Sequence, residues 1–331
     1  MKKTVILTVK IVVMVAVLGF VAWKLRKTWT DLRTHPLHLN PWYLIVALLA
    51  YLCVQLTNAL TWRWIAWRMG DRTRTVPLLG AYTFSQLGKY VPGKVLLVLL
   101  RAERATRLGM ARETCLLSTL LENAMYTLSA GLVGSVALVF VARDHPLYLV
   151  LCVALVAVLL ALFHPRVFYP ILNKILATFK RSAMKPANCL PERDLAGAVL
   201  LFFPSWFFGG IVLWATVHSM HAISPAEFPK LCGAFALSIC LGMFSLLPGG
   251  LGVREGVQAL FLAPLLHNAV DLVVVAVALP RLMQMSLELI LAGLGLLVVR
   301  RATAARPNGP ETIEQSANEL TPGACPPQAV A

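Results

Sequence analysis

Two stretches of this sequence place a proline–glycine pair and charged side chains inside otherwise apolar segments. Proline lacks the amide donor of a helix and glycine frees the backbone, so each pair is expected to end a helix. Backbone groups released at such a break, together with neighbouring cations, can hold an anion such as a phosphate. The residues concerned are Pro92, Gly93, Lys94 and Arg101 in the first stretch, and Pro248, Gly249, Gly250, Gly252, Arg254 and Glu255 in the second. Two ordinary loops at a membrane surface are the alternative interpretation.

Other polar residues recur at helical spacing within apolar segments. Arg281, Gln284 and Glu288 share one helical face, because they are spaced i, i+3 and i+7. The further stripes are Thr119, Glu122, Tyr126 and Ser129, and the weaker pair Gln55 and Asn58. An ionisable group near the bilayer centre costs about 2.5 to 3.5 kcal/mol on insertion scales, so these residues either neutralise one another structurally or line a cavity. The partner of Glu122 stays open among Arg101, Arg254 and Arg281.

Catalytic signatures are missing from the sequence. It carries no HExxH, GxSxG or P-loop pattern and no DxD pair for a metal-bound sugar nucleotide. The seven cysteines are scattered without the spacing of a metal site. We therefore expect no enzyme, no cofactor, no metal and no nucleic-acid partner. An enzyme would need its chemistry inside the membrane, with Glu255 or Glu103 as the base.

The elements that must position these residues are membrane helices. Hydrophobic residues make up 58% of the 331-residue chain and charged residues only 14%, which indicates lipid as the solvent. A helix needs about 20 apolar residues to cross a bilayer. The segments of suitable length are 5–23, 42–62, 115–141, 147–163, 195–217, 231–247 and 272–299. The predicted fold is an all-α polytopic membrane protein with about seven or eight passes, and its first segment is interpreted as a retained anchor.

Positive charge is unevenly distributed between the loops. Residues 164–193, residues 101–112 and the start of the tail are rich in Lys and Arg, whereas residues 218–229 contain neither. By the positive-inside rule the basic segments, and with them both termini, are predicted to be cytoplasmic.

The two halves of the chain follow a similar order. An integral membrane domain is predicted over residues 1–301, in halves of about 1–163 and 194–301 joined by the basic loop 164–193, with a disordered tail at 302–331. Interrupted segments at corresponding positions of two halves are typical of transporters built from an inverted repeat, and mark their substrate site. Whether residues 255–266 cross or re-enter the membrane stays open.

The two broken segments resemble the signatures of one family. LGKYVPGK at 87–94, followed by Arg101 and Glu122, is similar to its first signature, and LPGGLGVREG at 247–256, followed by Arg281, to its second. The family is the lysylphosphatidylglycerol synthase transmembrane-region, or flippase-like, family. The resemblance implies residence in a bacterial inner membrane and movement of an anionic or modified-headgroup lipid between leaflets.

The soluble aminoacyl-transfer domain of the full synthase is absent from this sequence, so lysylphosphatidylglycerol synthesis is not carried over. In the transport hypothesis Arg101, Arg254 and Arg281 hold the headgroup, and three glutamates balance them when the site is empty. The alternatives are an intramembrane transferase acting on a lipid-linked substrate, and a scaffold for a lipid- or glycan-modifying enzyme. The expected partners are therefore membrane lipids and such an enzyme. Cargo, energy coupling and oligomeric state are left open.

Overall fold

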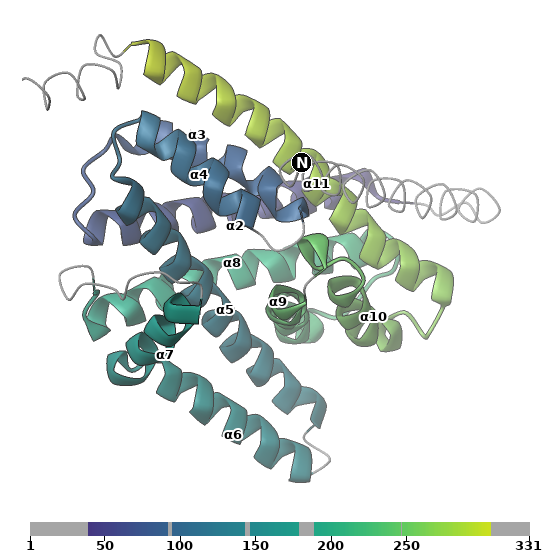
Figure 1. The fold of residues 1–331 in the computed structure, drawn as a ribbon. Helices are drawn as coiled ribbons and strands as arrows, with labels where there is room; N and C mark the ends of the chain where they lie inside the picture. The colour runs from purple at the N-terminus through teal and green to yellow at the C-terminus, as the bar shows by residue number, and fades with distance from the viewer. Residues whose placement is uncertain (1–38, 92–94, 143–145, 179–188, 246, 306–331) are drawn as a thin grey trace, which may run out of the picture.

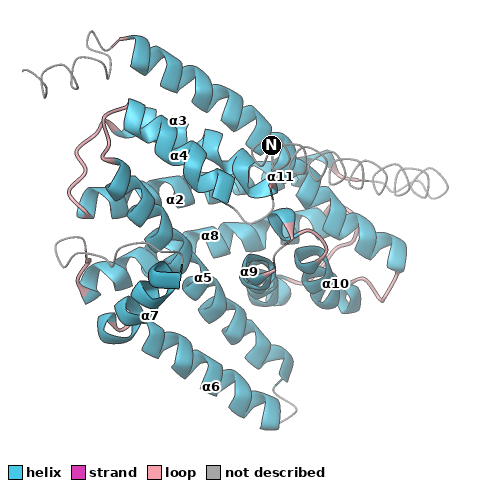
Figure 2. Ribbon diagram, viewed as in Figure 1, coloured by secondary structure: helices cyan, strands magenta, loops and turns pink. Residues whose placement is uncertain are grey.

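A computed structural model describes residues 39–91, 95–142, 146–178, 189–245 and 247–305, and every regular element within these ranges is helical (Figures 1 and 2). The predicted anchor at 5–23, almost all of the tail, and Pro92, Gly93 and Lys94 lie outside the described residues. The elements are α2 (Pro41–Arg68), α3 (Thr75–Ser85), η1 (Gln86–Tyr90), α4 (Val95–Arg107), α5 (Arg112–Ala142), α6 (Pro146–Phe163), α7 (Pro165–Thr178), α8 (Glu192–His218), η3 (Pro225–Glu227), α9 (Phe228–Phe244), η4 (Pro248–Gly250), α10 (Val253–Leu265) and α11 (Val270–Ala304).

The described helices confirm an all-α protein suited to a membrane. Within these residues, four segments are long and apolar enough to cross a bilayer, namely Pro41–Arg68, Glu192–His218, Pro225–Phe244 and Val270–Ala304. Large apolar side chains on α2, α8 and α11 point outward, among them Leu60, Leu200 and Leu289, while polar residues are buried between helices. An apolar outer surface around buried polar groups matches a lipid surround. The count of seven or eight passes stays a prediction.

Helices α2 and α8 pack side by side and run in opposite directions. At one end Arg68 Nη2 lies 2.6 Å from Asp194 Oδ2, and at the other the amide of Asn40 donates to the carbonyl of Ser219 at 3.0 Å. Midway along the pair, Ser205 Oγ donates to Asn58 Oδ1 at 2.7 Å. The two helices therefore form an antiparallel pair from which the rest of each half extends.

The order of elements repeats on either side of α6 and α7. The series α2, α3, η1, α4, α5 is followed by the series α8, α9, η4, α10, α11. Contacts repeat as well, since α3 packs against α11 in the same way that α9 packs against α5. Because α2 and α8 are antiparallel, the two series have opposite directions, which is the geometry of an inverted repeat. The matched elements cover residues 41–142 and 192–304.

Each half contains a helical hairpin. Helix α10 has 13 residues and is about 20 Å long, shorter than a hydrocarbon core of about 30 Å. It is followed by His267, whose ring lies 5.5 Å from that of His221 in the loop before α9. The chain therefore leaves η4 and returns to the face from which α9 began, so α9, η4 and α10 form a hairpin.

The hairpin of the first half enters from the opposite face. Residues 69–73, which precede α3, and residues 109–114, which follow α4, line one surface pocket, so α3 and α4 begin and end at the same face. That face is also the one marked by Arg68 and Asp194, at the far end of α2 and α8 from His221. The two hairpins thus approach each other from opposite sides of the protein.

Candidate functional site

The tips of the two hairpins meet inside the protein. Gly249 in η4 has a φ of 59°, and a Cβ added there would lie 3.3 Å from Cδ1 of Tyr90 in η1. Arg281 Nη2 of α11 donates to the carbonyl of Gly249 at 2.8 Å. The left-handed backbone and the close neighbours both favour glycine at this position. η1, just before the first predicted break, and η4, at the second, therefore lie together and are not separate loops.

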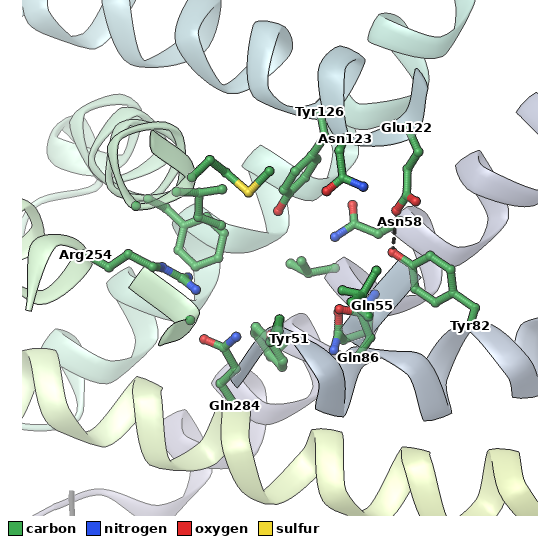
Figure 3. Close-up of a pocket in the computed structure, with 18 of the residues that line it drawn as sticks. Tyr51, Gln55, Asn58, Tyr82, Gln86, Glu122, Asn123, Tyr126, Arg254 and Gln284 are labelled. Atoms are coloured by element: carbon green, nitrogen blue, oxygen red, sulfur yellow. Dashed lines mark hydrogen bonds between the residues drawn. The ribbon is translucent and has the colours of Figure 1, made fainter. Parts of the chain in front are cut away.

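A cavity of about 110 Å³ lies beside this junction, and both polar and apolar side chains line it (Figure 3). The residues that line it come from both halves, and its hydrogen-bonding members include Tyr51, Gln55, Asn58, Tyr82, Gln86, Lys89, Arg101, Glu122, Asn123, Tyr126, Arg254 and Gln284. The cavity can hold a small, strongly polar group, such as a phosphate, at the point where the hairpins meet.

Arg101 of α4 and Glu122 of α5 form a buried ion pair on one side of the cavity. Glu122 also accepts a hydrogen bond from the Tyr82 hydroxyl at 2.9 Å. The Arg101 guanidinium donates to Ser85 Oγ at 3.1 Å and lies 4.2 Å from the Tyr82 ring centroid and 4.9 Å from that of Trp62. Both charges are therefore compensated within the first half, and Arg101 is the partner that sequence reasoning left undecided.

Glu288 of α11 is the centre of a second cluster. Its carboxylate accepts hydrogen bonds from Lys89 Nζ at 2.5 Å, the Tyr51 hydroxyl at 2.6 Å, Gln284 Nε2 at 2.8 Å and the Tyr90 hydroxyl at 2.8 Å. These four donors satisfy the acceptor sites of the buried carboxylate and stabilise its charged form. Because Lys89 and Tyr90 belong to η1, this cluster joins the first hairpin to the last helix of the second half.

Arg281 is held between α10, η4 and its own helix. Besides the Gly249 carbonyl, it donates to Gln284 Oε1 at 3.1 Å, and its Nε lies 3.4 Å from Glu255 Oε1. The other oxygen of Glu255 accepts from the amide of Gly252 at 2.6 Å and so caps the start of α10. Gln284 bridges Arg281 and Glu288, the two residues that share its helical face.

Arg254 differs from the other cations of the site. It lines the cavity from the first turn of α10, and it forms no ion pair or hydrogen bond with any residue that the structure describes. Its Nε is buried without a partner. A guanidinium offers five N–H donors and keeps its charge, and this one is half-buried, so leaving it unpaired is costly. This side chain is the one positioned to bind an anion that enters the cavity.

The structure brings together most of the residues selected from the sequence. The cavity lining includes Arg101, Glu122, Gly249, Arg254 and Gln284. Three residues outside the lining support it, namely Arg281, Glu255 and Glu288. Gly250 and Gly252 have φ angles of 71° and 84° and shape the turn from η4, which starts at Pro248, into α10. Glu103 is not part of the site, since it pairs with Arg107 on the surface.

Sequence reasoning did not select several residues of the site. Lys89 and Tyr90 stand within the first signature, and their position at a helix break was the available signal. Tyr51 lies one helical turn before the noted stripe of Gln55 and Asn58, so the face of α2 could have been extended to it. Gln86 offered no such signal, because only the fold places η1 against α11 and η4.

Comparison with known families agrees with the architecture. The family model described as lysylphosphatidylglycerol synthase TM region matches residues 6–292. The chain matches no curated protein. Most of the chain is therefore accounted for by one membrane family.

Proposed function

The chain belongs to the lysylphosphatidylglycerol synthase TM region family, and from this premise we propose that it is a lipid transporter of a bacterial inner membrane. It moves a lipid with an anionic or modified headgroup from one leaflet to the other. In this proposal it is a flippase and not an enzyme, its partners are membrane lipids, and its two termini are cytoplasmic.

The observation that carries the proposal is Arg254. A cation without a partner in a small cavity supports binding of the phosphate that every phospholipid carries. Arg101 and Arg281 have protein partners and act here as supports for the cavity. The sequence assigned headgroup binding to three arginines, whereas the present proposal assigns it to Arg254 alone.

The inverted repeat supports movement between leaflets. Two hairpins that enter from opposite faces and meet at the cavity allow the site to open to one face or the other as the halves rock. The cavity as described holds only a small group, which suits a closed intermediate around a headgroup. Apolar side chains facing outward on α2, α8 and α11 leave the acyl chains in lipid throughout.

Reconstitution in liposomes tests this function. Phosphatidylglycerol labelled on an acyl chain is placed in both leaflets, and a membrane-impermeant quencher reports how fast inner-leaflet lipid becomes accessible. Arg254→Gln removes the charge that meets the phosphate, so its transport rate is expected to fall about ten- to a hundredfold. Arg107→Gln, which changes an exposed arginine of α4, is the matched control and should leave the rate unchanged. Equal rates for wild type and Arg254→Gln would contradict the proposal.

A comparison of lipids separates transport from the transferase alternative. Cells lacking a transferase lose the lipid species that it makes, whereas cells lacking a flippase keep their lipid species and change only the leaflet distribution. Mass spectrometry of total lipid from cells with and without the protein is expected to give the same set of species. A missing species would favour the transferase.

A further inference from the structure

The charges around the cavity leave a single positive charge uncompensated among the described residues. The cations are Lys89, Arg101, Arg254 and Arg281, and the carboxylates are Glu122, Glu255 and Glu288. Lys89 pairs with Glu288, and Arg101 pairs with Glu122. Arg281 faces Glu255, which leaves Arg254 without a carboxylate. A phosphodiester carries one negative charge and would balance Arg254 alone.

The carboxylates are also unavailable to a cationic ligand. Glu288 already accepts four hydrogen bonds, and Glu122 is shared by Arg101 and Tyr82. Glu255 caps α10 and faces Arg281. An ammonium group brought into the cavity would therefore meet the unpaired Arg254 with no free carboxylate to stabilise it, which is strongly unfavourable in a desolvated site.

Two neutral amides are free to bind a ligand. Gln55 and Gln86 are only 7% and 9% exposed, line the cavity, and form no side-chain hydrogen bond with a described residue. Figure 3 shows them across the cavity from Arg254. An amide offers both donors and an acceptor, and a hydroxyl group needs both, so this pair matches a hydroxylated, uncharged group rather than an ion.

We infer that the headgroup bound by this site is a phosphodiester bearing an uncharged polyol, such as glycerol or a sugar, and not a cationic aminoacylated headgroup. The phosphate contacts Arg254, and the hydroxyl groups contact Gln55 and Gln86. This assignment rests on the proposed function and narrows it, since a lipid carrying a lysyl group is excluded by the same charges that admit its unmodified parent.

Transport of three labelled lipids tests the assignment. Acyl-labelled phosphatidylglycerol has the phosphodiester and the polyol, phosphatidic acid has the phosphate without the polyol, and lysylphosphatidylglycerol adds two ammonium groups. Phosphatidylglycerol is expected to cross about tenfold faster than either of the others. The difference comes from one or two lost hydrogen bonds for phosphatidic acid and from the uncompensated ammonium charges for lysylphosphatidylglycerol. Transport of lysylphosphatidylglycerol at the rate of phosphatidylglycerol overturns the assignment while the proposed function stands.

The two glutamines supply a sharper variant test. Gln55→Met together with Gln86→Met keeps side-chain length and removes hydrogen bonding, so the preference for phosphatidylglycerol over phosphatidic acid should disappear while phosphatidic acid still crosses. Gln258→Met is the matched control, because Gln258 is a buried glutamine that donates to Ser238 and does not line this cavity. A preference that persists in the double variant overturns the role of the amides.

Binding provides a readout that does not depend on transport. Short-chain dioctanoyl phosphatidylglycerol should raise the thermal unfolding midpoint of the purified protein, as any ligand of the folded state does, and dioctanoyl lysylphosphatidylglycerol should not. If no lipid crosses but this difference is found, the proposed transport fails and the headgroup assignment holds. Equal stabilisation by both lipids overturns the assignment.

Discussion

The two hairpins of this protein have the same order of elements but opposite treatment of charge. In the first, the short helix carries a cation, Arg101, and the long helix that follows carries its carboxylate, Glu122. In the second the signs are exchanged, with Glu255 on the short helix and Arg281 on the long one. The second hairpin also carries Arg254, which lines the cavity and forms no ion pair or hydrogen bond with a described residue.

This difference separates support from binding. A buried ion pair that is fully satisfied holds two helices in register but has nothing left to offer a ligand. A half-buried cation without a partner, such as Arg254, destabilises the empty protein and gains most when an anion binds. In the proposed function, the first hairpin is therefore the fixed wall of the site, and the second is the part that contacts the headgroup.

The largest effect is expected from breaking the pair in the first hairpin. Glu122→Met leaves Arg101 buried without a carboxylate, which should lower the free energy of unfolding by about 3 to 5 kcal/mol. Denaturant titration in detergent micelles measures the change. The double variant Arg101→Met/Glu122→Met should recover most of the stability. A single variant as stable as wild type would show that this pair is no support at all.

The link between the hairpins should matter less. Lys89→Met removes one of the four donors to Glu288 and the only charged one among them. The expected loss is about 1 to 3 kcal/mol of the free energy of unfolding, since three hydrogen bonds to the carboxylate remain. A double-mutant cycle with Glu288→Gln measures the coupling between them. Additive effects would contradict the view that Lys89 ties the first hairpin to α11.

The tip of the second hairpin is sensitive to backbone geometry. Gly249→Ala places a Cβ on a residue whose φ is 59° and 2.8 Å from Arg281 Nη2. Left-handed backbone costs about 1 to 2 kcal/mol for a residue with a Cβ, so thermal stability should fall by an amount of this size. Gly293→Ala is the matched control, because a Cβ there meets no atom within 4 Å. Equal effects of the two changes would contradict close contact at the tip.

The smallest effect is expected at the surface of the first hairpin. Glu103 and Arg107 form an exposed pair four residues apart on α4, with 47% and 53% of their side chains accessible. Glu103→Gln should change the free energy of unfolding by no more than about 0.5 kcal/mol and leave transport unaltered. A large loss of transport would show that the functional site extends from the cavity to the surface of α4, which would weaken the contrast between the two hairpins.

Local properties of the chain determined the positions of most helices and of the two breaks. Hydropathy and segment length depend only on neighbouring residues, and they located the described helices to within a few positions, including α2, α5, α8 and α11. Proline and glycine act on their own backbone, so the two breaks were also visible in the sequence. The i, i+3, i+7 spacing was enough to predict that Arg281, Gln284 and Glu288 share one helical face.

Only the tertiary structure decided how these pieces combine. A charge in the sequence carries no mark of its partner, and the choice of Arg101 for Glu122 and of Lys89 for Glu288 follows from helices that pack across 21 and 199 residues of chain. The same packing left Arg254 without a partner and placed Gln86 opposite it. The proposed selectivity for a phosphodiester that bears an uncharged polyol therefore depends on which charged side chains neutralise each other in the folded protein.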